Sequence, residues 1–256
     1  MIIGVVSGKG GVGKTTIASN LSYYLSSLGK NVTLIDCNVT TSHINFNFGF
    51  FSFKKTLNNV LRGEAEINEA IYKYKTLNII PASLRLEDLM YIDLLSLKNV
   101  IRNINSQIVF LDSAPGFGRE AMTVLNSVDA VLIVTIPFMN AIADVLRMKK
   151  ILEETNVLPL GIVVNMVKGK KYELSKSTIE AITGLKVIET VPYDENVEYA
   201  LSIGRPFIEI FPNTQASLAI KRLSNKLFGV EERKIGFFEG IKEKIKNLFL
   251  EKFKII

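Results

Sequence analysis

Short apolar runs rich in β-branched residues alternate along the chain with longer segments in which apolar residues recur every three or four positions. The short runs are apolar at most positions and do not alternate with polar residues, which is typical of strands buried on both faces of a sheet. They occupy residues 2–7, 31–36, 77–82, 107–112, 130–137, 160–165 and 187–192. The helical segments occupy residues 17–28, 84–104, 118–127, 139–155, 172–183 and 213–228. This alternation predicts a three-layer α/β fold, with a mostly parallel sheet of about seven strands and helices on both faces.

Two segments depart from this alternation. Residues 39–76 are less regular, and we expect loops and short helices there. After Gly229 the composition changes, because charged residues fill positions 231–234 and a lysine- and phenylalanine-rich stretch then runs to Ile256. We therefore divide the chain into one domain over residues 1–229 and an amphipathic tail over residues 230–256.

The composition fits a globular protein of the cytoplasm. Hydrophobic residues make up 48% of the 256 residues, which is enough for one full core. The single cysteine, Cys37, can form neither an internal disulfide nor a metal–thiolate cluster by itself. We expect no signal peptide and no membrane-spanning helix. The net charge of +6 is compatible with a lysine-rich surface, an anionic membrane or nucleic acid, and does not choose among them.

A glycine-rich loop joins the first predicted strand to the first predicted helix. Residues 8–15 fit the phosphate-loop (P-loop) pattern Gly-x-x-x-x-Gly-Lys-[Ser/Thr] in full. The glycines let successive amides point at one phosphate, and the start of the helix adds its positive dipole end. We expect Lys14 to bridge the terminal phosphates and the Thr15 hydroxyl to help hold Mg²⁺. The alternative is a glycine turn without chemical meaning, which does not explain a complete motif between a strand and a helix.

With this loop after its first strand, the predicted fold is a P-loop NTPase fold, which we expect to bind a nucleotide. Its predicted nucleotide-binding residues are Gly10, Gly11, Val12, Gly13, Lys14, Thr15 and Thr16. A carboxylate at the end of an apolar strand commonly holds Mg²⁺ through its water shell. Asp112 ends the run at 107–112 and is our candidate for this role, although it could instead cap a strand-to-loop turn.

An additional lysine precedes the glycines. Residues 9–16 read KGGVGKTT, which resembles the deviant P-loop of the MinD/ParA family of ATPases, and the MinD branch with its archaeal members most of all. The resemblance covers about residues 1–228. It implies that Lys9 reaches across a dimer interface to the phosphates of the other subunit's ATP. The alternative for Lys9 is an exposed lysine in a loop.

The same resemblance assigns catalytic and metal roles at the end of the run at 31–36. The family usually has Asp-x-Asp there, and this chain has Asp36-Cys37-Asn38. Asp36 matches the carboxylate near the metal shell, whereas Asn38 stands where a second carboxylate positions or activates the attacking water. An amide can orient a water molecule but cannot accept its proton. We therefore expect ATP hydrolysis that is slow or dependent on a partner, unless Asn38 is only a turn residue and another carboxylate serves.

Two further positions match the family's site for the base. Asn165, near the end of the run at 160–165, corresponds to an Asn that pairs with adenine. Pro192 belongs to Val-Pro-Tyr-Asp, which resembles a loop that packs on the base. The four residues from Asn165 lack the Asp that reads guanine, so we expect ATP, with Mg²⁺, as the cofactor. A turn at the strand end is the alternative for Asn165.

The tail has the pattern of a helix that lies on a membrane surface. Its apolar residues recur at three- and four-residue steps, and lysines occupy other positions around the helix. Residues 231–256 carry seven basic and five acidic side chains, a net charge of +2. We expect residues 235–256 to bind anionic lipid, strongly only when an ATP dimer brings two tails together. The alternative is a helix docked on the domain or on a partner.

These features predict a MinD-like ATPase switch that forms a homodimer with ATP and attaches reversibly to the inner face of the cell membrane. It would position a cell-division site or a polar cargo through a protein partner that the sequence does not identify. The alternative is a ParA-like DNA-segregation ATPase whose ATP dimer binds non-specific DNA, which the amphipathic tail disfavours.

Overall fold

The computed structural model describes residues 1–230, and the predicted tail segment at 235–256 lies outside these residues. Eight strands form one sheet in the order β3-β4-β2-β5-β1-β6-β7-β8. Every neighbouring pair is parallel except β3 and β4 at the edge. The strands are β1 (Ile2–Val6), β2 (Val32–Asp36), β3 (Tyr72–Tyr74), β4 (Leu77–Ile80), β5 (Ile108–Asp112), β6 (Ala130–Thr135), β7 (Leu158–Val167) and β8 (Val187–Pro192).

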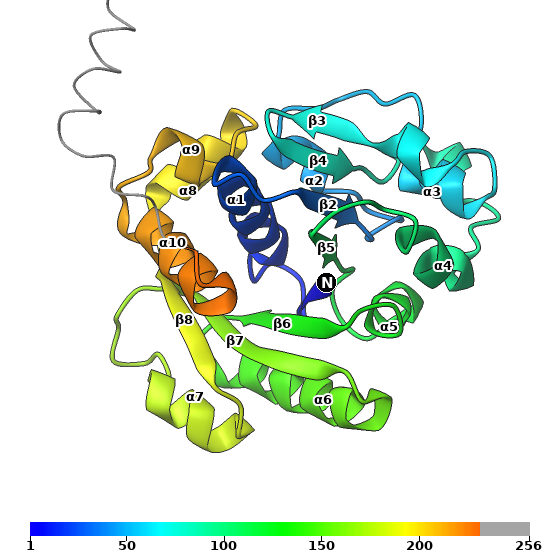
Figure 1. The fold of residues 1–256 in the computed structure, drawn as a ribbon. Coiled ribbons are helices and arrows are strands. Elements are labelled where there is room, and N and C mark those ends of the chain that lie inside the picture. Colours follow the sequence, from blue (N-terminus) through cyan, green and yellow to red (C-terminus); the bar gives the residue numbers. More distant parts are fainter. Residues whose placement is uncertain (231–256) are drawn as a thin grey trace, which may run out of the picture.

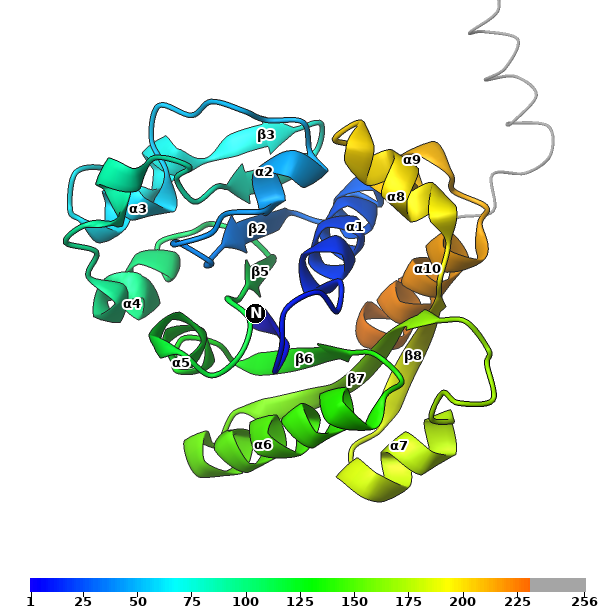
Figure 2. The ribbon, with the colours of Figure 1, turned by 180° about the vertical axis from the view of Figure 1, so that it is seen from behind.

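Helices cover both faces of this sheet, as Figures 1 and 2 show. On one face α1 (Lys14–Ser27) packs beside α10 (Gln215–Phe228), together with α2 (Ile44–Asn47), α8 (Glu195–Ser202) and α9 (Phe207–Ile210). The other face carries α3 (Leu57–Leu61), α4 (Leu97–Ile101), α5 (Arg119–Leu125), α6 (Met139–Thr155) and α7 (Lys176–Thr183). Short 3₁₀ helices occupy Ile67–Ala70, Leu86–Leu89 and Leu94–Ser96. None of the helices within residues 1–230 is long and apolar enough to span a lipid bilayer.

The structure confirms the predicted three-layer fold. All seven predicted strands are present, and the eighth, β3, lies in the segment for which we expected loops and short helices. It pairs antiparallel with β4 through a tight turn at Lys75, whose φ is 53°. The helix predicted over 139–155 has those bounds.

The helix predicted over 84–104 is wrong for most of its length. Two short 3₁₀ helices and the five-residue α4 occupy that segment. Tyr91 has a left-handed backbone with φ 60°, which ends any right-handed helix. Asp93 then caps the next turn by accepting a hydrogen bond from the Leu95 amide at 3.1 Å. Apolar spacing alone therefore overestimated this helix, since Leu86 and Leu95 are more than 80% exposed instead of packed.

The parallel order brings the ends of three strands to one place. In the register of β2 and β5, Asp36 lies directly opposite Asp112. On the other side of β5, Val5 of β1 is paired with Asp112, and the glycine loop follows β1. The two predicted carboxylates and the P-loop therefore meet at the carboxyl edge of the sheet, where ligands of open α/β folds bind.

Candidate nucleotide site

The glycine loop has a left-handed backbone and open space on its outer side. Gly11 and Gly13 have φ values of 79° and 84°, a left-handed conformation that glycine adopts without strain. Gly13 is the N-cap of α1 and has no side chain to bond the first amides of that helix. A Cβ atom added at Gly10 or Gly11 would meet nothing within 4 Å. The loop therefore has the open, donor-lined shape that a phosphate group requires.

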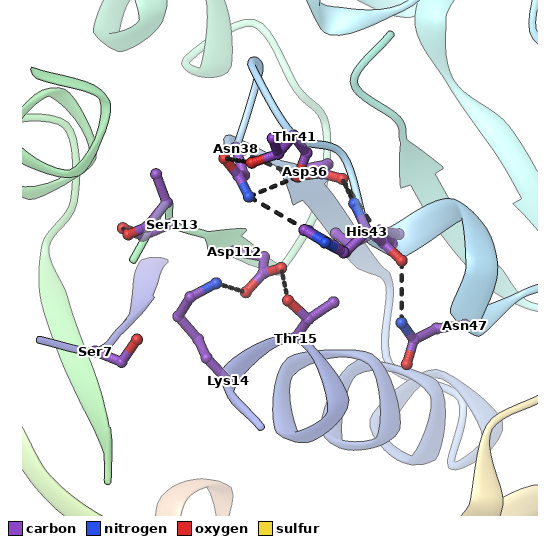
Figure 3. A network of polar contacts seen from close by, with 12 residues as sticks. Ser7, Lys14, Thr15, Asp36, Asn38, Thr41, His43, Asn47, Asp112 and Ser113 are labelled. Carbon is purple, nitrogen blue, oxygen red and sulfur yellow. Dashed lines mark hydrogen bonds and ion pairs between the residues drawn. The ribbon is translucent and has the colours of Figure 1, made fainter. Parts of the chain in front are cut away.

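Lys14 and Thr15 converge on one carboxylate. The Lys14 ammonium lies 2.6 Å from Oδ1 of Asp112, and the Thr15 hydroxyl donates to Oδ2 of Asp112 at 2.6 Å. Figure 3 shows the three side chains meeting between α1 and the end of β5. Lys14 and Asp112 are almost fully buried, so their charges are weakly screened.

Asp36 is the second buried carboxylate of the site. One of its oxygens accepts hydrogen bonds from the Ser42 hydroxyl and from the backbone N–H groups of His43 and Ile44. The other oxygen accepts one from the backbone N–H of Asn38. Burial, together with the neighbouring charge of Asp112, nevertheless raises the pKa of Asp36 to about 6. Two neighbouring carboxylates in a dry site are best stabilised by a cation beside them.

These groups fit a magnesium–nucleotide complex. Mg²⁺ is commonly held by one or two carboxylates together with substrate phosphates and water. Thr15, Asp36 and Asp112, the three predicted metal residues, lie at one edge of the sheet and offer oxygen ligands only. With a nucleotide bound, the Lys14 ammonium would contact phosphate oxygens in place of Asp112. Asp112 and Asp36 would then be available to hold Mg²⁺.

The phosphate end of the site is an open cavity of about 390 Å³. The residues that line it include Ser7, Lys9, Gly10, Gly11, Val12, Gly13, Lys14, Thr15, Thr16, Asn38, Thr41, His43, Phe46, Asn47, Pro115 and Leu201. The structure thus brings Asn38 and both lysines of the motif to one cavity. Their catalytic roles stay predictions.

A smaller apolar cavity of about 90 Å³ adjoins this one, since Thr16 and Leu201 line both. Asn165 and Pro192, the two residues predicted to contact the base, line it together with Tyr193. Asn165 lies within β7, not at its end, and its Nδ2 donates to the Val12 carbonyl at 2.9 Å. This bond leaves Oδ1 of Asn165 to accept from a ligand.

The sequence interpretation missed the loop that follows β2. Thr41, His43, Phe46 and Asn47 line the phosphate-side cavity, although they belong to the segment for which no regular pattern was found. One signal was present in the sequence. His43 is the single histidine of the chain and follows Asn38 by five residues, but no motif marked it.

Comparison with known proteins shows what the chain as a whole is similar to. A family model described as the CobQ/CobB/MinD/ParA nucleotide binding domain matches residues 3–207. An ATP-binding protein of Methanocaldococcus jannaschii is 36% identical over 97% of this chain and 98% of its own. The cell division ATPase MinD of Pyrococcus furiosus has a similar structure, with a TM-score of 0.85, 26% identity and coverage of 90% and 99% of the two chains. MinD of Pyrococcus horikoshii, solved with Mg-ADP, has a TM-score of 0.85 and 25% identity over 89% and 95%.

Proposed function

Because the chain belongs to the CobQ/CobB/MinD/ParA family of nucleotide-binding proteins, we propose that it is a MinD-like ATPase switch that dimerises with ATP and cycles on and off a membrane. The observation that carries this proposal is the phosphate-side cavity, into which the motif lysines Lys9 and Lys14 both face beside the paired carboxylates Asp36 and Asp112. In this role the protein positions a partner or cargo in the cell.

The chain's own residues hold the nucleotide from two ends. Lys14 and the loop amides bind the phosphates, while Thr15, Asp36 and Asp112 hold Mg²⁺ directly or through water. The metal, when bound, neutralises charge on the phosphate oxygens. Asn165 contributes to the choice of base, because the hydrogen bond from its Nδ2 to Val12 leaves its oxygen and the second hydrogen of Nδ2 for the ligand. The oxygen can accept from the amino group of adenine, whereas guanine has at that position a carbonyl oxygen, which cannot donate to it.

Lys9 supplies the link between nucleotide and dimer. It is half-buried at the rim of the cavity, and a second subunit facing this cavity would bring its own Lys9 to the triphosphate. A cation contributed in trans stabilises the dimer only while the terminal phosphate is present. Dimerisation then reports the nucleotide state.

The dimer is tested by analytical ultracentrifugation with Mg²⁺ and a non-hydrolysable ATP analogue or ADP. We expect a dimer with the analogue, a monomer with ADP, and a monomer in both for Lys9→Ala. Lys98→Ala, which removes an exposed lysine of α4, is the matched control and should dimerise normally. A Lys9→Ala protein that dimerises as well as the control would contradict the trans role.

Membrane attachment follows from two tails acting together. Each well-placed lysine contributes about 1 kcal/mol on an anionic surface, so one tail binds weakly and two bind with avidity. We expect co-sedimentation with vesicles of anionic lipid in ATP, little in ADP, and none after deletion of residues 235–256. Equal sedimentation in all three conditions would refute membrane cycling. ATP-dependent, salt-sensitive binding to DNA, measured by gel shift, would favour the ParA-like alternative.

Hydrolysis is the slow step of this switch. Asn38 has no carboxylate with which to take a proton from water, and both of its polar atoms are engaged with Thr41. The ATP state is therefore long-lived until a partner completes the site. A single-turnover assay of the purified protein measures this, and rapid hydrolysis without any partner would contradict it.

A further inference from the structure

The loop after β2 contains a small network that determines how Asn38 is oriented. Nδ2 of Asn38 lies 2.6 Å from the carbonyl oxygen of Thr41, and the Thr41 hydroxyl lies 3.0 Å from Oδ1 of Asn38. A carbonyl oxygen can only accept a hydrogen bond, so the atom that faces it must be the amide nitrogen. Thr41 therefore fixes the amide in one of its two possible orientations.

The second hydrogen of this nitrogen faces His43. The ring atom Nδ1 of His43 lies 3.5 Å from Nδ2 of Asn38, at the outer limit for a hydrogen bond. Figure 3 shows the ring of His43 turned toward Asn38, on the same side of the site as Asp112. Since Nδ2 is a donor, Nδ1 is the acceptor, and the proton of a neutral ring is then on Nε2. In the charged form Nε2 also carries a proton, so this atom is a donor in either state.

From this geometry we propose that Nε2 of His43 donates a hydrogen bond to the terminal phosphate of bound ATP, and that Asn38 is a positioning residue for His43. His43 lines the same cavity as Lys9, Lys14 and the glycine loop. Asn38 in place of a carboxylate then has a structural reason, since a carboxylate could not donate to Nδ1. This inference rests on the proposed ATP site and adds to it a residue that distinguishes ATP from ADP.

The rest of the loop does not depend on the His43 side chain. The backbone N–H of His43 donates to Asp36, and its carbonyl oxygen accepts from Nδ2 of Asn47. The ring itself is exposed. Substitution of the side chain thus leaves the contacts of the predicted metal residue Asp36 in place.

Two substitutions separate a phosphate contact from a packing role. In His43→Gln the side-chain amide reaches about as far as Nε2 and keeps a donor there, whereas in His43→Asn it reaches only as far as Nδ1. Calorimetric titration with Mg²⁺ and a non-hydrolysable ATP analogue, and separately with ADP, gives the affinities. We expect about a tenfold weaker affinity for the analogue in His43→Asn, recovery of most of it in His43→Gln, and unchanged affinity for ADP in both.

The role of Asn38 is tested on the ring directly. Because His43 is the single histidine of the chain, the ¹⁵N spectrum of labelled imidazole in an untagged protein reports this ring alone. We expect the tautomer protonated at Nε2 in the unmodified protein at alkaline pH, and a mixture of tautomers in Asn38→Ala. A mixture already present in the unmodified protein would overturn the positioning role.

Three results would overturn the phosphate contact of His43. They are equal losses for the ATP analogue and ADP, no loss in His43→Asn, and a loss in His43→Gln as large as that in His43→Asn. Failure of the unmodified protein to bind either nucleotide would instead overturn the proposed function itself, so the two failures are distinguishable.

Discussion

Replacing Asn38 by Asp tests whether the missing carboxylate limits hydrolysis. In Asn38→Asp an oxygen takes the position of Nδ2, 2.6 Å from the carbonyl oxygen of Thr41. Two acceptors repel at this distance, so the new carboxylate must rotate away from the carbonyl oxygen of Thr41. Asn38 lines the cavity that the P-loop also lines, so a carboxylate that rotates into this cavity comes nearer to a bound triphosphate.

The size of the effect follows from two opposing terms. A positioned general base accelerates a reaction by about 10²- to 10⁴-fold. Against this stands the lost hydrogen bond to Thr41, which costs about 1 kcal/mol, or about fivefold. Dividing the smallest gain, about 100-fold, by the cost of about fivefold predicts a chemical step about 20-fold faster in Asn38→Asp than in the unmodified protein. The hydroxyl of Thr41, 3.0 Å from Oδ1, still has a carboxylate oxygen to donate to.

Single-turnover hydrolysis with enzyme in excess measures this step without product release. ATP binding must be saturated, because the substitution also removes the donor to His43. Asn38→Ala is the matched control, since it lacks both the amide and the carboxylate, and it should be no faster than the unmodified protein. If Asn38→Asp is not faster than Asn38→Ala, the reasoning that a carboxylate is the missing component is refuted.

Three further predictions concern stability and base selection. In Gly13→Ala the new Cβ would lie 2.1 Å from Nδ2 of Asn165 at a φ of 84°, so thermal unfolding should occur several degrees lower, whereas Gly10→Ala, with open space, should unfold as the unmodified protein does. Asn165→Ala should bind ATP about tenfold more weakly and prefer it less over GTP, as competition titration would show. Burial and the neighbouring charge of Asp112 raise the pKa of Asp36 from 3.8 to about 6, so the folded protein loses stability as pH rises from about 4 to about 6 and this group ionises. Denaturant unfolding of Asp36→Asn in the absence of Mg²⁺ should lack this contribution, and an unchanged pH slope would contradict it.

The strands and the P-loop were predictable because their signals are local. A strand buried on both faces of a parallel sheet is apolar at most positions, and each such run became a strand. The glycine motif carries its own structural context, since it requires a strand before it and a helix after it. The pairing of Asp36 with Asp112 also follows once both end neighbouring parallel strands.

The loop after β2 was not predictable, because its structure is determined by partners far away in the sequence. Asn58, for example, donates to the carbonyl oxygens of Val39 and Asp88, and so connects this loop to the irregular segment near residue 88. That segment itself was predicted as a helix from the spacing of its apolar residues, but several of these residues do not pack into the core. The orientation of Asn38 depends instead on a near neighbour, the Thr41 carbonyl three residues away, but no residue pattern specifies this contact.

The same loop contacts structural elements at both ends of the proposed nucleotide site. The His43 amide holds Asp36 at one end, and α2, which begins at the next residue, packs against the turn after α8 at the other. A Cβ added at Gly204 would lie 2.6 Å from Cα of Gly49, so these two backbones are in direct contact. Leu201 of α8 lines both cavities. Contacts therefore run without a break from the loop that holds Asp36 to Leu201, whose side of the structure also forms part of the wall of the smaller cavity.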